Sequence, residues 1–184
     1  MSDSEYQKTL HERWAAAPES DPPAPWHRAR NGIVGGVYAV GLSESGEFLL
    51  SISHSGRYVI DCKTGETVER DHDDAQESWL DTSRLLADGV GPLAGVKVRV
   101  AGSFIGGGFA AMTPDGWAVE RAAPAWPHEV VWVEEADKPG FYQDGTFYKV
   151  WDWDPPFAYG FSVSGTTLVV ACSNEIKIWS RPDR

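Results

Sequence analysis

The amino-acid sequence predicts a mainly β fold of antiparallel meander sheets with one N-terminal helix. The prediction rests on two runs of short apolar segments separated by Ser- and Gly-containing turns, one early and one late, and on a helical apolar period confined to the first residues. Such alternation of apolar segments and polar Gly turns is typical of hairpins. Strands are expected in the two runs at residues 37–41, 48–53, 58–62, 158–162, 168–172 and 176–180.

The helix is expected over residues 2–17. Ser2 and Glu5 stand in capping-box spacing. Tyr6, Leu10 and Trp14 recur every fourth residue and predict one apolar stripe that docks on the sheet. Pro18 ends the helix. We therefore predict a single domain over 1–184, with the helix at 1–17, a Pro-rich connector at 18–31 that is too stiff and polar to pack as an element, and a β domain at 32–184.

The middle of the chain adds further β segments and two ambiguous ones. Residues 71–82 are acidic around Trp79, and residues 83–95 read as a short helix with a glycine stop or as a loop. The turn Pro114-Asp115-Gly116 lies between two apolar segments and predicts a hairpin. Strands are expected here at residues 96–100, 109–113, 117–122, 130–134 and 147–151.

The two runs also resemble each other, which indicates a repeated sheet unit. Gly41-Leu42-Ser43 matches Gly160-Phe161-Ser162, and Ser45-Gly46 matches Ser164-Gly165. The hairpin at 109–122 carries a weaker version. Residues 37–66, ending in Thr64-Gly65-Glu66, and residues 159–180, reaching Trp179, are similar to blades of WD-repeat and related β-propeller proteins.

That resemblance implies propeller-like sheets, and the sequence departs from it in two ways. The Gly-His element of the family is absent. A blade needs about 40 to 45 residues, so 184 residues allow four blades at most, and fewer beside the helix and connector. We expect a small or incomplete propeller-like arrangement, with a sandwich or barrel of the same meanders as the alternatives.

Composition narrows the partner classes. The formal net charge is −11 and no basic stripe is present, so a nucleic-acid partner is not expected. No apolar run approaches the roughly 18 residues of a membrane span, so no membrane partner is expected and the location is expected to be cytoplasmic. Cys62 and Cys172 are interpreted as buried free thiols, with a single bridge left open.

No motif points to catalysis. The five histidines lack zinc spacing, and no Gly-x-Ser-x-Gly elbow occurs. His72 lies in an acidic run without the glycine and distal Glu of a calcium loop. Residues 106–108 form a glycine run followed by a strand-like segment, which favours a bulge over a phosphate cradle. We expect no metal, no cofactor and no enzyme, although unrecognised acid–base chemistry is a third alternative.

Two clusters combine acids with tryptophan and are the candidate partner-binding residues. They are Asp71, Asp73, Asp74, Glu77 and Trp79, and Trp151, Asp152, Trp153 and Asp154. Exposed Trp beside acids would anchor a basic partner, whereas the alternative places Trp in the core and Asp in turns. The leading hypothesis is an immunity or antitoxin protein that occludes a basic toxin. A propeller-like scaffold or ligand module is the second hypothesis.

Overall fold

The computed structural model describes residues 3–29, 35–125, 128–138, 140, 145–152 and 154–183. In this part of the chain the strands form four sheets. The largest contains β5 (Thr67–Asp71), β4 (Gly56–Asp61), β3 (Phe48–Ser53), β2 (Val37–Leu42) and β9 (Ala101–Gly102), in that order. A second contains β1 (His27–Arg28), β15 (Ile176–Ser180), β14 (Thr167–Ala171) and β13 (Ala158–Phe161).

The other two sheets have three strands each. One is β10 (Trp117–Ala125), β11 (His128–Glu135) and β12 (Phe147–Trp151), and the other is β6 (Leu80–Asp81), β7 (Leu86–Asp88) and β8 (Lys97–Arg99). The helical segments are α1 (Asp3–Ala16), α2 (Gln76–Trp79) and a 3-10 turn, η1 (Gly91–Leu93). All strand pairs within these sheets are antiparallel, so the mainly β meander class with an N-terminal helix is confirmed.

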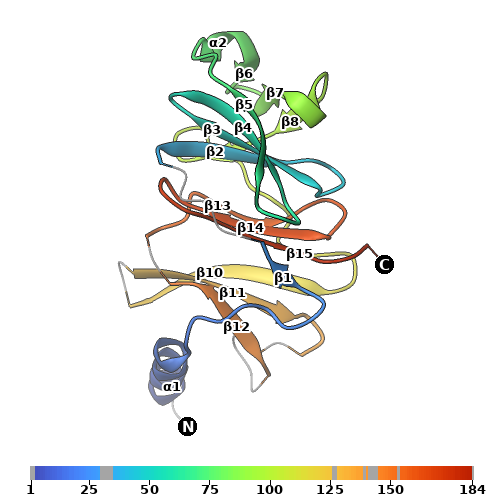
Figure 1. Ribbon diagram of the computed structural model, residues 1–184. Coiled ribbons are helices and arrows are strands. Elements are labelled where there is room, and N and C mark those ends of the chain that lie inside the picture. Colours follow the sequence, from blue (N-terminus) through green and yellow to red (C-terminus); the bar gives the residue numbers. More distant parts are fainter. Residues whose placement is uncertain are drawn as a thin grey trace.

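The sheets lie one above another as an open stack (Figure 1). The order is β6–β8, then β2–β5, then β13–β15, then β10–β12, with α1 at the end. Three apolar clusters lie between successive sheets: Leu93 belongs to the first, Val169 to the second and Trp151 to the third. Because neighbouring sheets bury each other's faces, the inner strands are apolar on both sides instead of alternating. β2 is buried at every position for this reason.

Several segments differ from the expectation. β1, β5, β6 and β7 were not predicted, and residues 109–113 contribute only isolated bridges, at Ala110 and Met112. The ambiguous stretch 83–95 contains β7 and η1 instead of an α-helix. These elements are two to five residues long, too short for a periodic apolar pattern to develop.

The Pro-rich connector packs against the sheets, contrary to the expectation. Its last residues form β1, which pairs with β15. Glu19 accepts a hydrogen bond from Lys177 at 2.5 Å, and Asp21 accepts one from the Trp179 indole at 2.8 Å. Trp26 is buried. Polar side chains do not prevent this segment from packing, because Glu19 and Asp21 both meet hydrogen-bond donors on β15.

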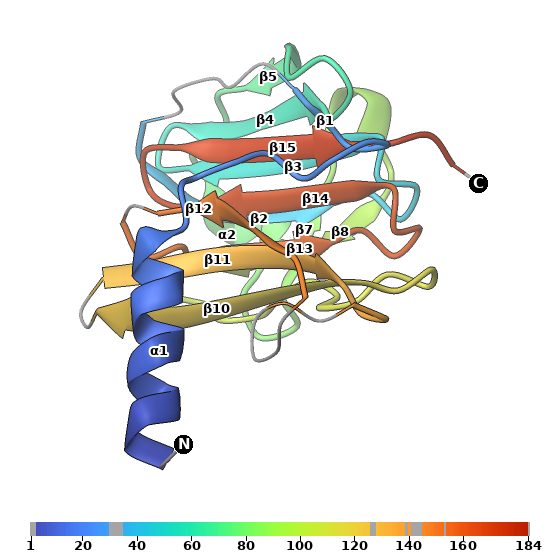
Figure 2. The same ribbon diagram turned by 90° about the horizontal axis from the view of Figure 1, so that it is seen from below.

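α1 lies across the sheet of β10 and β11 (Figure 2). Leu10 and Trp14 are buried with Val130 and Trp132. Tyr6, the third residue of the predicted stripe, is 41% exposed, so the docking extends only over the C-terminal half of the helix. Ser2 of the predicted capping box lies outside the described residues.

Three turns from three sheets share one hydrogen-bond pattern. In each, the first hydroxyl residue accepts from a backbone N–H four or five residues later: Ser43 from Phe48 at 3.1 Å, Ser162 from Thr167 at 3.1 Å and Thr113 from Trp117 at 2.9 Å. The sequence similarity between the runs therefore corresponds to equivalent turns.

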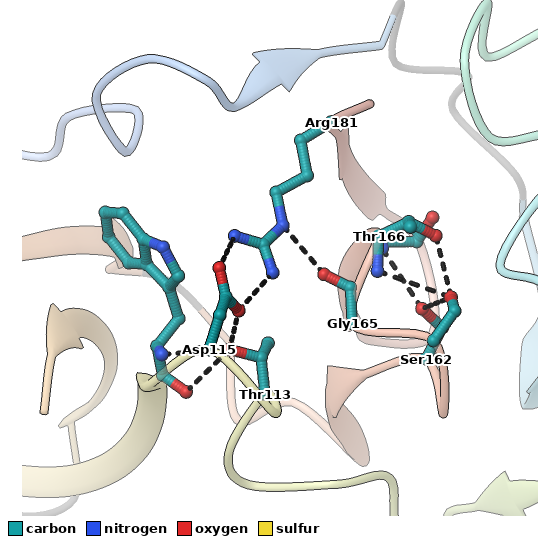
Figure 3. A network of polar contacts seen from close by, with 9 residues as sticks. Thr113, Asp115, Ser162, Gly165, Thr166 and Arg181 are labelled. Atoms are coloured by element: carbon teal, nitrogen blue, oxygen red, sulfur yellow. Dashed lines mark hydrogen bonds and ion pairs between the residues drawn. The ribbon is translucent and has the colours of Figure 1, made fainter. Parts of the chain in front are cut away.

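The turn at 162–167 contacts both of the others, and Figure 3 shows its link to the turn at 113–117. Thr166 Oγ1 donates to Ser45 O at 2.9 Å, which joins the first turn to the last. Arg181 donates to both carboxylate oxygens of Asp115, at 2.7 and 2.5 Å, and to Gly165 O at 2.8 Å. Arg181 thus links the turn at 113–117 to the turn at 162–167.

Candidate partner-binding surface

The first predicted cluster begins where β5 ends. Asp71 accepts hydrogen bonds from Arg57 Nε and Nη2 at 3.0 and 2.7 Å. These bonds lower the pKa of Asp71, so it stays ionised at neutral pH. Its other oxygen accepts from the Asp73 N–H, and Asp73 in turn accepts from the Ala75 N–H. Asp71 and Asp73 therefore hold the loop that leads into α2.

Trp79, the aromatic member of this cluster, does not lie on the surface. It is 4% exposed and packs in the cluster between the two upper sheets of Figure 1. The Arg57 guanidinium lies 4.5 Å from its ring centroid. The interpretation of Trp79 as an exposed anchor is wrong, because the ring is the apolar partner of a buried arginine.

The second predicted cluster is also largely internal. Trp151 is 0% exposed, its indole donates to Asp154 O at 2.8 Å, and Lys177 Nζ lies 4.9 Å from its ring centroid. Asp152 accepts from Lys149 at 2.7 Å and contacts the His128 ring. Trp153 lies outside the described residues. Trp151 is therefore not an exposed anchor either, and of this cluster the described residue that faces solvent is Asp154.

The electrostatics of Asp152 follow from this setting. Burial by itself raises the pKa of this carboxyl, but hydrogen bonds from Lys149 and His128 outweigh burial and bring the pKa below its usual value. Asp152 therefore serves as an ionised partner for Lys149, whose side chain is 4% exposed. It cannot at the same time present a free negative charge to another protein.

The structure does not bring the two clusters together. The first lies beside β5 and α2, and the second follows β12 at the far end of the stack, with the sheet of β13–β15 between them (Figure 1). A partner that contacted both clusters would have to span the stack. The predicted residues thus do not form one continuous surface.

An exposed acidic strip does remain at the first cluster. We call it the acidic edge and define it as Glu66, Glu69, Asp73, Asp74 and Glu77. Glu66 directly precedes β5, Glu69 lies in it, Asp73 and Asp74 lie in the loop after it, and Glu77 lies in α2; all five are exposed. None forms an ion pair with a cation in the described part of the chain. Val68, in the middle of β5, is 46% exposed.

The acidic edge includes two residues that sequence reasoning missed. Glu66 follows the turn at Thr64-Gly65, and Glu69 follows Val68. An apolar residue between polar and acidic residues after a turn is a signal for a short edge strand. That signal was hidden because the predicted repeat unit ended at Glu66. β5 is the outermost strand of its sheet, which places these carboxylates at the sheet edge.

The described residues contain no group of three or more His, Cys, Asp or Glu side chains arranged to hold a metal ion. His72 is exposed in the loop before α2. Cys62 and Cys172 are both free and buried. No described helix combines the length and apolar character that crossing a membrane requires.

Comparison with known proteins adds no family assignment. No protein-family model matches the chain, and no curated protein sequence matches it. The candidate surface therefore depends on its geometry alone.

Proposed function

We propose that the chain is a non-enzymatic binding domain whose partner is a basic protein. The observation that carries the proposal is the acidic edge, a series of five exposed carboxylates from Glu66 to Glu77 that form no ion pair with a cation among the described residues. Elsewhere on the chain, carboxylates such as Glu19, Asp115 and Asp152 are used in internal ion pairs. Like charges held close together are unfavourable, and a basic partner relieves the repulsion.

The most concrete form of this proposal is an immunity or antitoxin protein. Acidic side chains would raise the rate of encounter with a basic toxin and orient it, and the bound domain would occlude the toxin's active site. The small size and the net charge of −11 support this role. The two free buried thiols suit a reducing compartment, so a cytoplasmic location is part of the proposal.

A propeller-like scaffold is the second candidate. The observation that favours it is the set of equivalent turns at 43–48, 113–117 and 162–167, of which the last is linked to each of the other two. Stacked sheet units of this kind present loops at their ends for other proteins. This function would place the binding residues in the turns and not on the acidic edge.

An affinity capture with a charge-reversed variant tests the leading proposal. The tagged full chain is used as bait in a lysate of the source cell, beside the variant Asp74→Lys/Glu77→Lys. The control is Glu12→Lys/Asp137→Lys, which changes the net charge equally at exposed residues away from the acidic edge. The proposal expects a basic protein that the wild type and the control retain and the Asp74/Glu77 variant loses.

Kinetics of the purified complex then distinguish the two candidates. We expect a one-to-one complex whose association rate falls by about tenfold or more between 50 and 300 mM NaCl, because electrostatic steering is screened by salt. The captured protein should also lose its own activity at one equivalent. Equal capture by both charge-reversed variants, or association rates independent of salt, would contradict the proposal. Such a result would favour the second candidate, in which the turns bind the partner.

A further inference from the structure

A cavity of about 540 Å³ lies between the sheet of β2–β5 and the sheet of β13–β15. The β2–β3 turn, the β4–β5 turn and the end of β15 form this cavity. It therefore lies at one end of β5, and the loop that carries Asp73 and Asp74 lies at the other end. Its volume falls in the range of small-molecule sites in proteins. The lining residues are His27, Gly46, Glu47, Cys62, Lys63, Thr166, Thr167, Ser180, Arg181 and Pro182.

The walls of this cavity are held by the contact between two of the equivalent turns. Thr167 Oγ1 donates to Gly46 O at 2.6 Å, and Thr166 Oγ1 donates to Ser45 O at 2.9 Å. A Cβ at Gly46 would lie 2.6 Å from Thr166 Oγ1 and 2.7 Å from Ser162 Oγ, so only glycine lets the turns approach. The shape of the cavity is therefore determined by the contact between the turns of two neighbouring sheets and does not depend on one mobile side chain.

Three polar side chains of these walls already have hydrogen-bond partners. The two threonine hydroxyls donate to the opposite turn, and Arg181 is held by Asp115 and Gly165. Cys62, at a buried position of the wall, is an apolar thiol. A ligand in the interior would thus meet mainly apolar or already paired groups, which favours an apolar and flat ligand body.

The rim is different because it carries a lysine and a histidine without partners among the described residues. Lys63 Nζ and the His27 ring form no hydrogen bond or ion pair with a residue that the structure describes. Glu47 is the carboxylate among the described lining residues, and its Oε2 accepts a hydrogen bond from Ser45. An exposed lysine without a partner is notable in a chain with a net charge of −11, where most described lysines pair with acids.

We propose that this cavity binds a small molecule with an aromatic or otherwise flat apolar body and one anionic group, the body inside the cavity and the anion at Lys63 and His27. The apolar interior supplies affinity by burial, and Lys63 selects the sign of the ligand's charge. Of the acidic edge, Glu66 belongs to the same turn as Lys63, whereas Asp73, Asp74 and Glu77 follow the other end of β5. Substitution of Asp74 and Glu77 therefore tests the proposed protein partner independently of this site.

Two probes with the same aromatic body and opposite charge test the proposal. The full chain, labelled with ¹⁵N, is titrated with 2-naphthalenesulfonate and with 2-naphthylmethylammonium. We expect the sulfonate to shift the amide resonances of Gly46, Lys63 and Thr167 with one-to-one saturation and a Kd on the order of 0.1 mM for a ligand of this size. The ammonium probe should bind about tenfold more weakly, since it meets Lys63 with the same charge.

A matched pair of variants isolates the role of Lys63. Lys63→Met should weaken sulfonate binding about fivefold, the size expected for an exposed charge pair. Lys8→Met, on the exposed side of α1, makes the same change in charge and should leave the affinity unchanged. Ser180→Phe, which fills the cavity, should abolish binding of both probes while the dispersion of the remaining resonances shows that the chain is folded.

Three results would overturn the proposal. One is the absence of shifts at the cavity amides up to 5 mM probe, a concentration about fifty times the expected Kd. Another is equal affinity for the sulfonate and the ammonium probe, and the third is equal sulfonate affinity of the Lys63→Met and Lys8→Met variants. Because Lys63 is exposed, its substitution tests the proposal even if Ser180→Phe fails to fold.

Discussion

Buried cations explain much of the tryptophan content of this chain. Each of four cationic side chains, all at most 9% exposed, contacts both a carboxylate and the face of a tryptophan. The sets are Arg57 with Asp71 and Trp79, Lys149 with Asp152 and Trp132, Lys177 with Glu19 and Trp151, and Arg181 with Asp115 and Trp26. A buried charge is costly unless it is paired, and an aromatic face adds a second favourable contact.

The Asp115–Arg181 pair predicts a pH-dependent effect on stability. Arg181 lowers the pKa of Asp115 well below its usual range through two hydrogen bonds. Asp115→Asn should lower the free energy of unfolding at pH 7 by about 2–4 kcal/mol, because it leaves a buried guanidinium unpaired. Since the folded pKa is lowered, this contribution is complete above the unfolded pKa of about 3.9 and is lost as the pH falls below it.

Urea unfolding of the wild type and Asp115→Asn at pH 7, 5 and 3 checks this prediction. The difference in the free energy of unfolding should be the same at pH 7 and 5 and smaller at pH 3. Asp137→Asn, at an exposed residue, is the control and should change little at any pH. A difference that grows toward acid pH would contradict the assigned role of Asp115.

The two cysteines should be unreactive in the native state. Cys62 is 1% exposed and Cys172 is 2% exposed. Burial, helped by the nearby charge of Asp61, raises the pKa of the Cys62 thiol, so little of the reactive thiolate forms at pH 8. Titration with 5,5′-dithiobis(2-nitrobenzoate) should detect both thiols in denaturant and neither within minutes in buffer. Rapid labelling of one thiol in buffer would indicate that its surroundings open readily.

At the scale of elements, the connector between α1 and β2 holds two sheets together, and we call its contacts through Glu19 and Asp21 the clasp. Glu19 bridges to Lys149 through the backbone and binds Lys177 through its side chain, and Asp21 binds Trp179. Lys149 belongs to β12 and Lys177 to β15, so the connector joins two neighbouring sheets. Its prolines favour an extended path.

A double-mutant cycle tests the clasp. Glu19→Gln should destabilise the chain by about 3 kcal/mol, because Lys177 would remain buried without a counter-charge. Lys177→Met combined with Glu19→Gln should recover most of that loss, since a buried apolar side chain replaces the charge. Chemical unfolding of the two single variants and the double variant measures the coupling. A double variant that loses the sum of the two single effects would show that the pair is not coupled.

At the scale of the whole molecule, the stack order differs from the chain order. The sheet of β13–β15, which is last in the sequence, lies directly on the sheet of β2–β5, which comes early, and β1 completes the last sheet. The middle of the chain forms the two end sheets of the stack, and the N-terminal α1 covers one of them. Each apolar cluster thus includes residues that are distant in sequence, which favours cooperative folding.

This arrangement predicts that the last strand is indispensable. Deletion of residues 175–184 would remove β15, the pairing partner of both β14 and β1, and the Lys177 and Trp179 contacts of the connector. We expect loss of the cooperative unfolding transition and of the near-ultraviolet circular dichroism of the tryptophans. Deletion of residues 183 and 184 alone, the control, should leave both signals. A cooperative transition in the longer deletion would mean that the other sheets are stable without β15.

The acidic strip of the partner surface was only partly foreseeable. The acids at 71–77 stand out in the sequence, whereas Glu66 and Glu69 depend on β5 being an edge strand, which its short pattern does not establish. The expected alternation of Trp151 and Trp153 with Asp152 and Asp154 stays a prediction, because β12 ends at Trp151 and Trp153 lies outside the described residues. The surroundings of Trp151 and Asp152 depend on two lysines. Lys177 of β15 lies over the Trp151 ring, and Lys149 of β12 pairs with Asp152.

What the sequence determined by itself is the succession of the longer strands and the turns between them, including the equivalence of the turns at Ser43, Thr113 and Ser162. These features depend on apolar alternation and on hydrogen bonds that span four or five residues, so local sequence suffices to specify them. Tertiary structure alone decided which tryptophans are covered and which carboxylates remain free. Those outcomes depend on partners such as Glu19 and Lys177, which are 158 residues apart and meet only when the sheets stack.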